Sequence, residues 1–191
     1  MFQLCRGRRL AWLAACATVA VAGVIGAASP SWASSPIDVP AGNHLVRVVH
    51  AEGQQIYQCT QNATGFGWTL LRPAAVLFNG DNTVFGFHTY TLNAASGQNV
   101  PTWAALDGSW VQAVRVSSIP SPDGPGNIPW VLLKEVASGS GIGSTLTATT
   151  YVQRTNTVGG VAPSALCDQA TVGAVQGSDY DADYSFYEAG A

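Results

Sequence analysis

The fold is decided by residues 128–136, Ile128-Pro129-Trp130-Val131-Leu132-Leu133-Lys134-Glu135-Val136. This stretch follows the most turn-rich part of the chain, residues 118–127, which holds three prolines and two glycines. It precedes a loop rich in Ser and Gly, residues 138–144. A short run that is apolar on consecutive positions and bounded by turn residues is typical of a strand buried on both faces. We therefore expect residues 128–136 to form a central strand on which the other strands pack.

The rest of the chain predicts one all-β domain. Its 191 residues are 47% hydrophobic and only 10% charged, with 21 glycines, which suits a single β-rich domain with a sizeable core. Short apolar segments separated by frequent turns predict a single β-sandwich or flattened barrel with long loops. The expected strands are residues 45–50, 55–59, 66–70, 83–90, 102–104, 109–117, 128–136, 145–154 and 183–188.

Alternation within these strands assigns side chains to faces. Phe85 and Phe87 are expected on one face of residues 83–90, and His88 and Tyr90 on the other. Glu52-Gly53 is expected to separate residues 45–50 from residues 55–59, so that these two segments form a hairpin.

The beginning of the chain has the pattern of an export signal. Three arginines precede an apolar run over residues 10–28, and Ser31-Trp32-Ala33 presents small residues at the positions that a signal peptidase recognises. We expect residues 1–33 to be a signal peptide, residues 34–41 a loose leader and residues 42–191 the single β-rich domain. The expected location is secreted, either free or associated with the cell wall. An uncleaved anchor and a lipoprotein signal at Cys16 are the alternatives.

The charge of the exported chain excludes some partners. Without residues 1–33 the chain keeps five Lys and Arg against 11 Asp and Glu, a net charge of −6. Such a surface repels phosphate backbones, so no nucleic-acid partner is expected. No later segment is long and apolar enough for a membrane span. An unknown ligand, a glycan or another component of the cell envelope is the expected partner.

Two cysteines remain after the signal, Cys59 and Cys167. In an exported chain two cysteines most simply form one disulfide, and two buried free thiols are the alternative. Neither cysteine has a second Cys or a His at metal-ligand spacing, so no metal site and no cofactor are expected.

The sharpest candidate site combines His88, Trp103 and Asp107. A His–Asp pair can orient an imidazole for acid–base chemistry, although no serine or cysteine nucleophile stands in a recognisable elbow. The alternative is that Asp107-Gly108 forms a turn capped by its own carboxylate, and that His88 is a hydrogen-bonded strand residue. The leading hypothesis is a non-enzymatic binding or structural module. The rival is a secreted hydrolase-like enzyme that uses His88 and Asp107.

Three weaker patterns each leave two interpretations open. Alternating carboxylates in residues 179–183 could hold calcium, or could form a solvated acidic edge strand. Arg154 could bind an anion, or could fasten the adjacent Gly-Gly loop, residues 155–163, through backbone carbonyls. Tryptophans could stack on sugar rings, or could fill the core; they are Trp68, Trp103, Trp110 and Trp130.

Several separated motifs also resemble one known family. They are Gly53-Gln54-Gln55-Ile56-Tyr57-Gln58-Cys59, Pro101-Thr102-Trp103 with Asp107-Gly108-Ser109, Ile128-Pro129-Trp130-Val131-Leu132-Leu133, the stretch from Tyr151 to Pro163 with Cys167 behind it, and Tyr184-Ser185-Phe186-Tyr187. Over about residues 39–188 the chain resembles the domain-of-unknown-function family numbered 3455, whose members are mostly exported bacterial and fungal proteins.

The resemblance implies no established activity, ligand or catalytic residue that could be transferred. Some fungal members are labelled malate dehydrogenase, but Gly139-Ser140-Gly141-Ile142-Gly143 lacks the spacing of a dinucleotide-binding fingerprint. Family members often carry an acidic residue directly after Pro-Thr-Trp, where this chain has Ala104. The His that precedes this motif is also further from it here, because residues 92–100 intervene.

Overall fold

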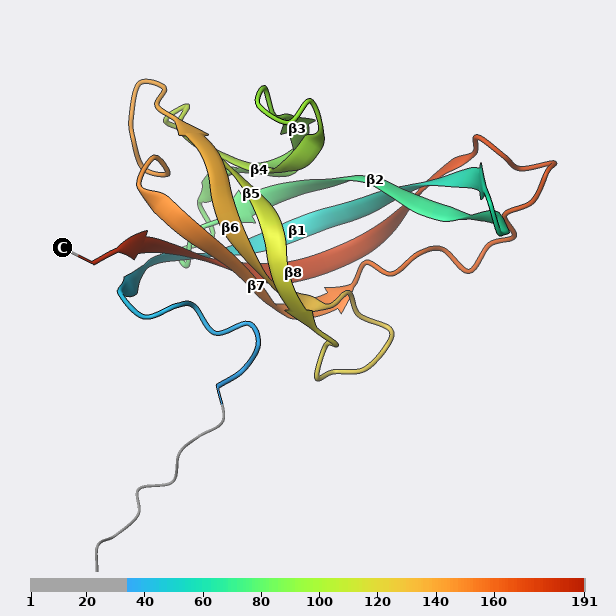
Figure 1. The fold of residues 1–191 in the computed structure, drawn as a ribbon, viewed down its shortest axis with the longest axis horizontal. Coiled ribbons are helices and arrows are strands. Elements are labelled where there is room, and N and C mark those ends of the chain that lie inside the picture. Colours follow the sequence, from blue (N-terminus) through green and yellow to red (C-terminus); the bar gives the residue numbers. More distant parts are fainter. Residues whose placement is uncertain (1–33, 191) are drawn as a thin grey trace, which may run out of the picture. The chain divides into compact units, whose positions relative to one another are not determined.

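Eight antiparallel strands close into a barrel in the computed structural model, which describes residues 34–190 (Figure 1). The strands are β1 (Asn43–Asn62), β2 (Gly65–Phe78), β3 (Val84–Leu92), β4 (Asn99–Ala105), β5 (Trp110–Ile119), β6 (Trp130–Gly139), β7 (Thr149–Gly159) and β8 (Val175–Ala189). Each strand pairs with the next in sequence, and β1 pairs with β8 to close the sheet. The all-β class and the barrel alternative are confirmed. The sandwich alternative is wrong, because the sheet closes on itself.

The predicted signal, residues 1–33, lies outside the described residues. Within the described part of the chain, no helix has the length and apolar character needed to cross a membrane.

The first half of β6 is buried on both faces, as its sequence predicts, because Val131, Leu132 and Leu133 are all buried. The second half is not, since Lys134 and Val136 are exposed. Leu132 lies opposite Gln153 of β7, whose side-chain amide donates to the carbonyl of Ile37 at 2.8 Å. Ile37 is itself buried, so the segment of residues 34–41, expected as a loose leader, is held against β7 at this residue. A closed barrel has no central strand, however, and β6 is one of eight equivalent wall elements.

The hairpin expected around Glu52-Gly53 is wrong, because β1 runs unbroken through both residues. Gly53 pairs with Ala75 of β2, and a Cβ atom at Gly53 would clash with the carbonyl oxygen of Ala74. The glycine therefore permits a close approach of two strands and does not form a turn.

A bulge in β3 corrects the expected faces of its two phenylalanines. Leu77 of β2 pairs with Gly86 and Phe78 with Val84, so Phe85 is the extra residue of the bulge. Phe85 is buried, with its ring centroid 6.2 Å from that of Phe186, whereas Phe87 is 51% exposed.

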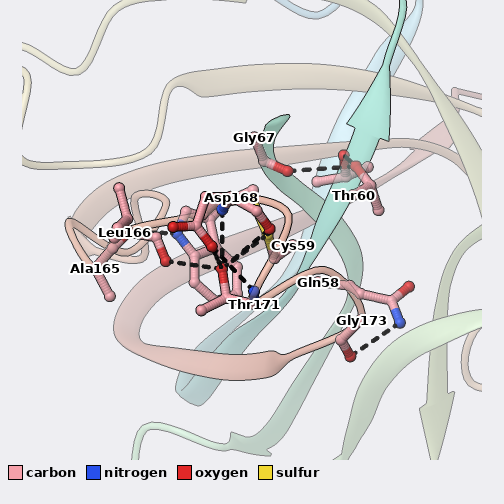
Figure 2. The surroundings of a disulfide bond; sticks show 12 residues. Gln58, Cys59, Thr60, Gly67, Ala165, Leu166, Asp168, Thr171 and Gly173 are labelled. Carbon is pink, nitrogen blue, oxygen red and sulfur yellow. Dashed lines mark hydrogen bonds between the residues drawn. A yellow bond between two sulfur atoms is a disulfide. The ribbon is translucent and has the colours of Figure 1, made fainter. Parts of the chain in front are cut away.

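A disulfide joins Cys59 of β1 to Cys167, as expected, with the two Cα atoms 5.4 Å apart. Cys59 lies near the end of β1, opposite Trp68 of β2 and next to the start of β8. In this part of the molecule β1, β2 and β8 extend past the other strands (Figure 1). Gly173 donates its backbone N–H to the carbonyl of Cys59 at 2.8 Å. The side chains of Asp168 and Thr171 bond to each other beside the disulfide (Figure 2). The long segment between β7 and β8 is thereby held against β1.

The acidic residues of β8 do not form an edge. Strand β8 pairs with β1 on one side and β7 on the other, so the edge-strand interpretation is wrong. Asp179 accepts a hydrogen bond from Gln54, and Asp183 accepts hydrogen bonds from His50 Nδ1 and Asn156. In residues 34–190, no group of three or more His, Cys, Asp or Glu side chains is placed to hold a metal ion.

Candidate functional site

A pocket of about 370 Å³ lies in the lumen of the barrel, and every strand contributes a side chain to its wall. Its size falls within the range of small-molecule sites, about 300–1,000 Å³. The lining residues are Gln55, Leu70, Pro73, His88, Tyr90, Pro101, Trp103, Val114, Arg115, Val131, Leu133, Arg154 and Tyr184.

The wall of the barrel is incomplete beside this pocket. Strand β2 pairs with β3 only through residues 75–78, and β4 pairs with β5 only through residues 102–104. In the far part of the β3–β4 hairpin, the two strands therefore pair only with each other and with no other described strand. The side chain of Gln112 ties it to β5 instead, by donating to Thr91 Oγ1 and accepting from Asn93 Nδ2, each at 2.8 Å.

His88 and Trp103 form the aromatic floor of the pocket. They are directly opposite in the β3–β4 ladder, and their rings stack with centroids 4.4 Å apart and planes at 10°. Tyr184 of β8 completes the cluster, with its ring centroid 5.0 Å from His88 and 5.3 Å from Trp103. The inward positions of His88 and Tyr90 agree with the predicted alternation.

His88 is held neutral. Burial lowers the pKa of His88 to about 3; its hydrogen bond to Thr102 opposes this shift, and the charge of Arg154 adds to it. Because a carbonyl oxygen can only accept, Nδ1 carries the proton and donates it to the Thr102 carbonyl at 2.9 Å. Nε2 is then a hydrogen-bond acceptor, available to a hydroxyl or N–H group of a ligand.

Three buried polar groups in the pocket wall lack a partner among the described protein atoms. They are Gln55 Nε2, Trp103 Nε1 and the Tyr184 hydroxyl, on residues that are 2%, 1% and 1% exposed. Buried donors are almost always hydrogen-bonded, and an unmade bond costs about 1–3 kcal/mol. The wall of the lumen therefore holds three hydrogen-bond donors that have no partner among the described protein atoms.

The pocket wall carries positive charge and no carboxylate. Two of the five Lys and Arg residues beyond residue 33, Arg115 and Arg154, line the pocket, and none of the 11 Asp and Glu residues does. Arg154 donates from Nε and Nη2 to the carbonyl of Pro129, at 3.3 and 2.8 Å. Arg154 thus binds a backbone carbonyl, but in the segment before β6 and not in the Gly-Gly loop that follows it in sequence. Three of its five N–H groups are not used by this contact.

Asp107 lies apart from His88 and Trp103. One of its carboxylate oxygens accepts from Ser109 N and Oγ, and the other accepts from Thr145 N and Oγ1. These hydrogen bonds hold the pKa of Asp107 below its usual range. Asp107 does not line the lumen pocket, so the structure brings together two of the three predicted site residues. The carboxylate fastens its own turn, where Gly108 has a φ of 80°, to the loop before β7.

The four tryptophans within residues 34–190 do not form an exposed platform. Trp103 is buried, and Trp68, Trp110 and Trp130 are half-buried. Trp68 donates its indole N–H to the carbonyl of Ala165 at 2.8 Å, next to the disulfide.

Comparison with known proteins places the chain in a family without assigning an activity. The family model described as "Protein of unknown function (DUF3455)" matches residues 40–188. The chain belongs to the DUF3455 family. No curated protein and no solved structure matches it. The function of this DUF3455 barrel must therefore be argued from the chemistry of its own lumen.

Proposed function

We propose that this protein is an exported binding module that holds a small molecule in the lumen of its barrel. The observation that carries the proposal is a pocket built by all eight strands whose wall contains three buried, unpartnered donors, Gln55 Nε2, Trp103 Nε1 and the Tyr184 hydroxyl. The basic start and apolar run of residues 1–33 and the disulfide support export.

The wall chemistry favours binding over hydrolysis. A hydrolase that used His88 and Asp107 would need the two side chains in one hydrogen-bonded unit, but His88 bonds to Thr102 and Asp107 to Ser109 and Thr145. A neutral imidazole stacked on an indole instead provides a flat surface and a single acceptor.

The proposal is tested by thermal unfolding of the purified protein with a panel of small metabolites, sugars and organic acids. A ligand present at 100 times its dissociation constant stabilises the folded state by ~2.7 kcal/mol, which corresponds to about 5–10 °C in a chain of this size. A variant with a blocked lumen, Val114→Trp, should abolish the shift produced by any hit.

The matched control is Val116→Trp, on the same strand but outside the pocket wall, which should preserve the shift. Both valines are exposed, so neither substitution disturbs the packed core. A hit that stabilises wild type and Val114→Trp equally would contradict binding in the lumen.

A further inference from the structure

We infer that the lumen pocket takes a small organic anion, with its acidic group at Arg154 and Arg115 and its apolar body against the aromatic floor. This inference rests on the proposed function and specifies the ligand class.

The charge distribution provides the first argument. Beyond residue 33 the chain has more than twice as many acidic as basic residues, yet the pocket wall holds two arginines and no carboxylate. In residues 34–190 neither arginine forms a salt bridge. A half-buried guanidinium gains most from a bidentate acceptor such as a carboxylate.

The second argument is that the positive charge of Arg154 acts on side chains in and beside the lumen. Burial raises the pKa of Tyr57 and of Tyr90, and the positive charge of Arg154 opposes that rise at both residues. An anion placed in the pocket would meet the same positive field. The hydrogen bonds from Arg154 to the carbonyl of Pro129 fix the guanidinium in place and leave three N–H donors for the anion.

The remaining wall specifies the body of the ligand. Trp103 and Tyr184 present aromatic surface, and Val131 and Leu133 present aliphatic surface. Neutral His88 adds an acceptor but no charge. The wall therefore matches an acid with an aromatic or aliphatic body better than a polyanion such as a nucleotide, whose several charges exceed the two arginines available.

The test is calorimetric titration with two matched pairs of probes, 2-naphthoate against 2-naphthamide and hexanoate against hexanamide. The members of each pair share a body and differ in charge. We expect wild-type protein to bind each acid about tenfold more tightly than its amide, as befits a charge-assisted hydrogen bond. Arg154→Gln should bring the ratio close to one while the affinity for the amides stays nearly unchanged. Arg115→Gln, which alters an exposed residue, should lower the ratio less.

The control is Arg72→Gln, which removes an exposed arginine of β2 that does not line this pocket and should leave the ratio unchanged. Equal binding of acids and amides by wild type would overturn the inference while leaving the proposed function in place. An acid-to-amide affinity ratio that stays unchanged in both Arg154→Gln and Arg115→Gln would also overturn the inference. Binding of neither series would overturn the inference together with the proposed function. If Arg154→Gln does not fold, Arg154→Lys and Arg115→Gln decide: the first must keep a preference for acids, and the second must weaken it.

Discussion

At the scale of single residues, His88 shows how burial selects the chemistry of the site. A histidine near neutral pH commonly exchanges protons, but here the imidazole is buried, stacked on Trp103 and bonded through Nδ1 to Thr102. Because burial lowers its pKa to about 3, His88 does not act as a proton donor near pH 7. His88 therefore contributes a flat ring surface and one hydrogen-bond acceptor, Nε2, to the pocket wall.

Replacing His88 should remove part of the pH dependence of stability. The pKa of His88 falls from 6.5 in the unfolded chain to about 3 in the folded one. The unfolded state therefore binds more protons in this window, and the stabilising contribution is complete above about pH 6.5 and is lost as the pH falls toward 3. Between pH 7 and about pH 4.5, wild type should lose about 2–3 kcal/mol more stability than His88→Gln. Urea unfolding of both proteins at the two pH values measures this, and equal losses would show that His88 is not held neutral.

Sequence alternation found some residues of the pocket but not others. It placed His88 and Tyr90 on one face, and the ladder then sets Trp103 opposite His88. Gln55 was missed because a polar residue in a strand is normally assigned to solvent. Gln55 lies two residues before the buried Tyr57 and so shares its face of the strand, which was the available signal. Alternation alone, however, does not say which polar residue faces a lumen.

At the scale of elements, β1 shows the limit of turn signals in a sequence. Glycine in a strand can indicate a turn or the close approach of another backbone, and only the three-dimensional pairing distinguishes the two. The buried run of β6 was predictable because consecutive apolar residues need cover on both faces. The bulge at Phe85 was not predictable, because no local sequence pattern specifies an extra residue in the pairing of β2 with β3.

Adding a methyl group at Gly53 should therefore destabilise the barrel. A Cβ atom there would clash with the backbone of Ala74 and Ala75, which cannot move without disturbing the β1–β2 ladder. Gly53→Ala should lower the free energy of unfolding by about 1–3 kcal/mol. Gly67→Ala on β2 is the control, because its nearest neighbour would be Asn62 Nδ2 at 4.0 Å. Denaturant unfolding measures both variants. Equal stability of Gly53→Ala and Gly67→Ala would contradict this role of Gly53.

The disulfide should stabilise the barrel by holding the segment between β7 and β8 against β1. It closes a loop with a sequence separation of 108 residues, and the chain-entropy model gives ~4.7 kcal/mol for a loop of about 100 residues. We expect Cys167→Ser to lose about 2–4 kcal/mol in denaturant unfolding. Reduced wild type should match the variant. Retention of full stability by both would show that the hydrogen bonds around Cys59 suffice.

At the scale of the whole molecule, closure of the sheet creates the site. The composition and turns predicted strands, but the pairing of β1 with β8 joins the two ends of the domain and is not written in any local pattern. The lumen and its polar wall follow from that closure. For this reason the sequence could name His88 and Trp103, but not the pocket that Gln55 and Arg154 share with them.

The most direct test of the lumen site is the nitrogen–proton NMR spectrum of the protein during titration with 2-naphthoate and, separately, with 2-naphthamide. Trp103 Nε1–H and Gln55 Nε2 have no partner among the described protein atoms and lie in the pocket wall, whereas Trp110 borders a separate apolar hollow between β3 and β6. The account predicts that the signals of Trp103 and Gln55 shift on binding of at least one probe while that of the Trp110 indole stays in place. Shifts at Trp110 with Trp103 and Gln55 unchanged would contradict it.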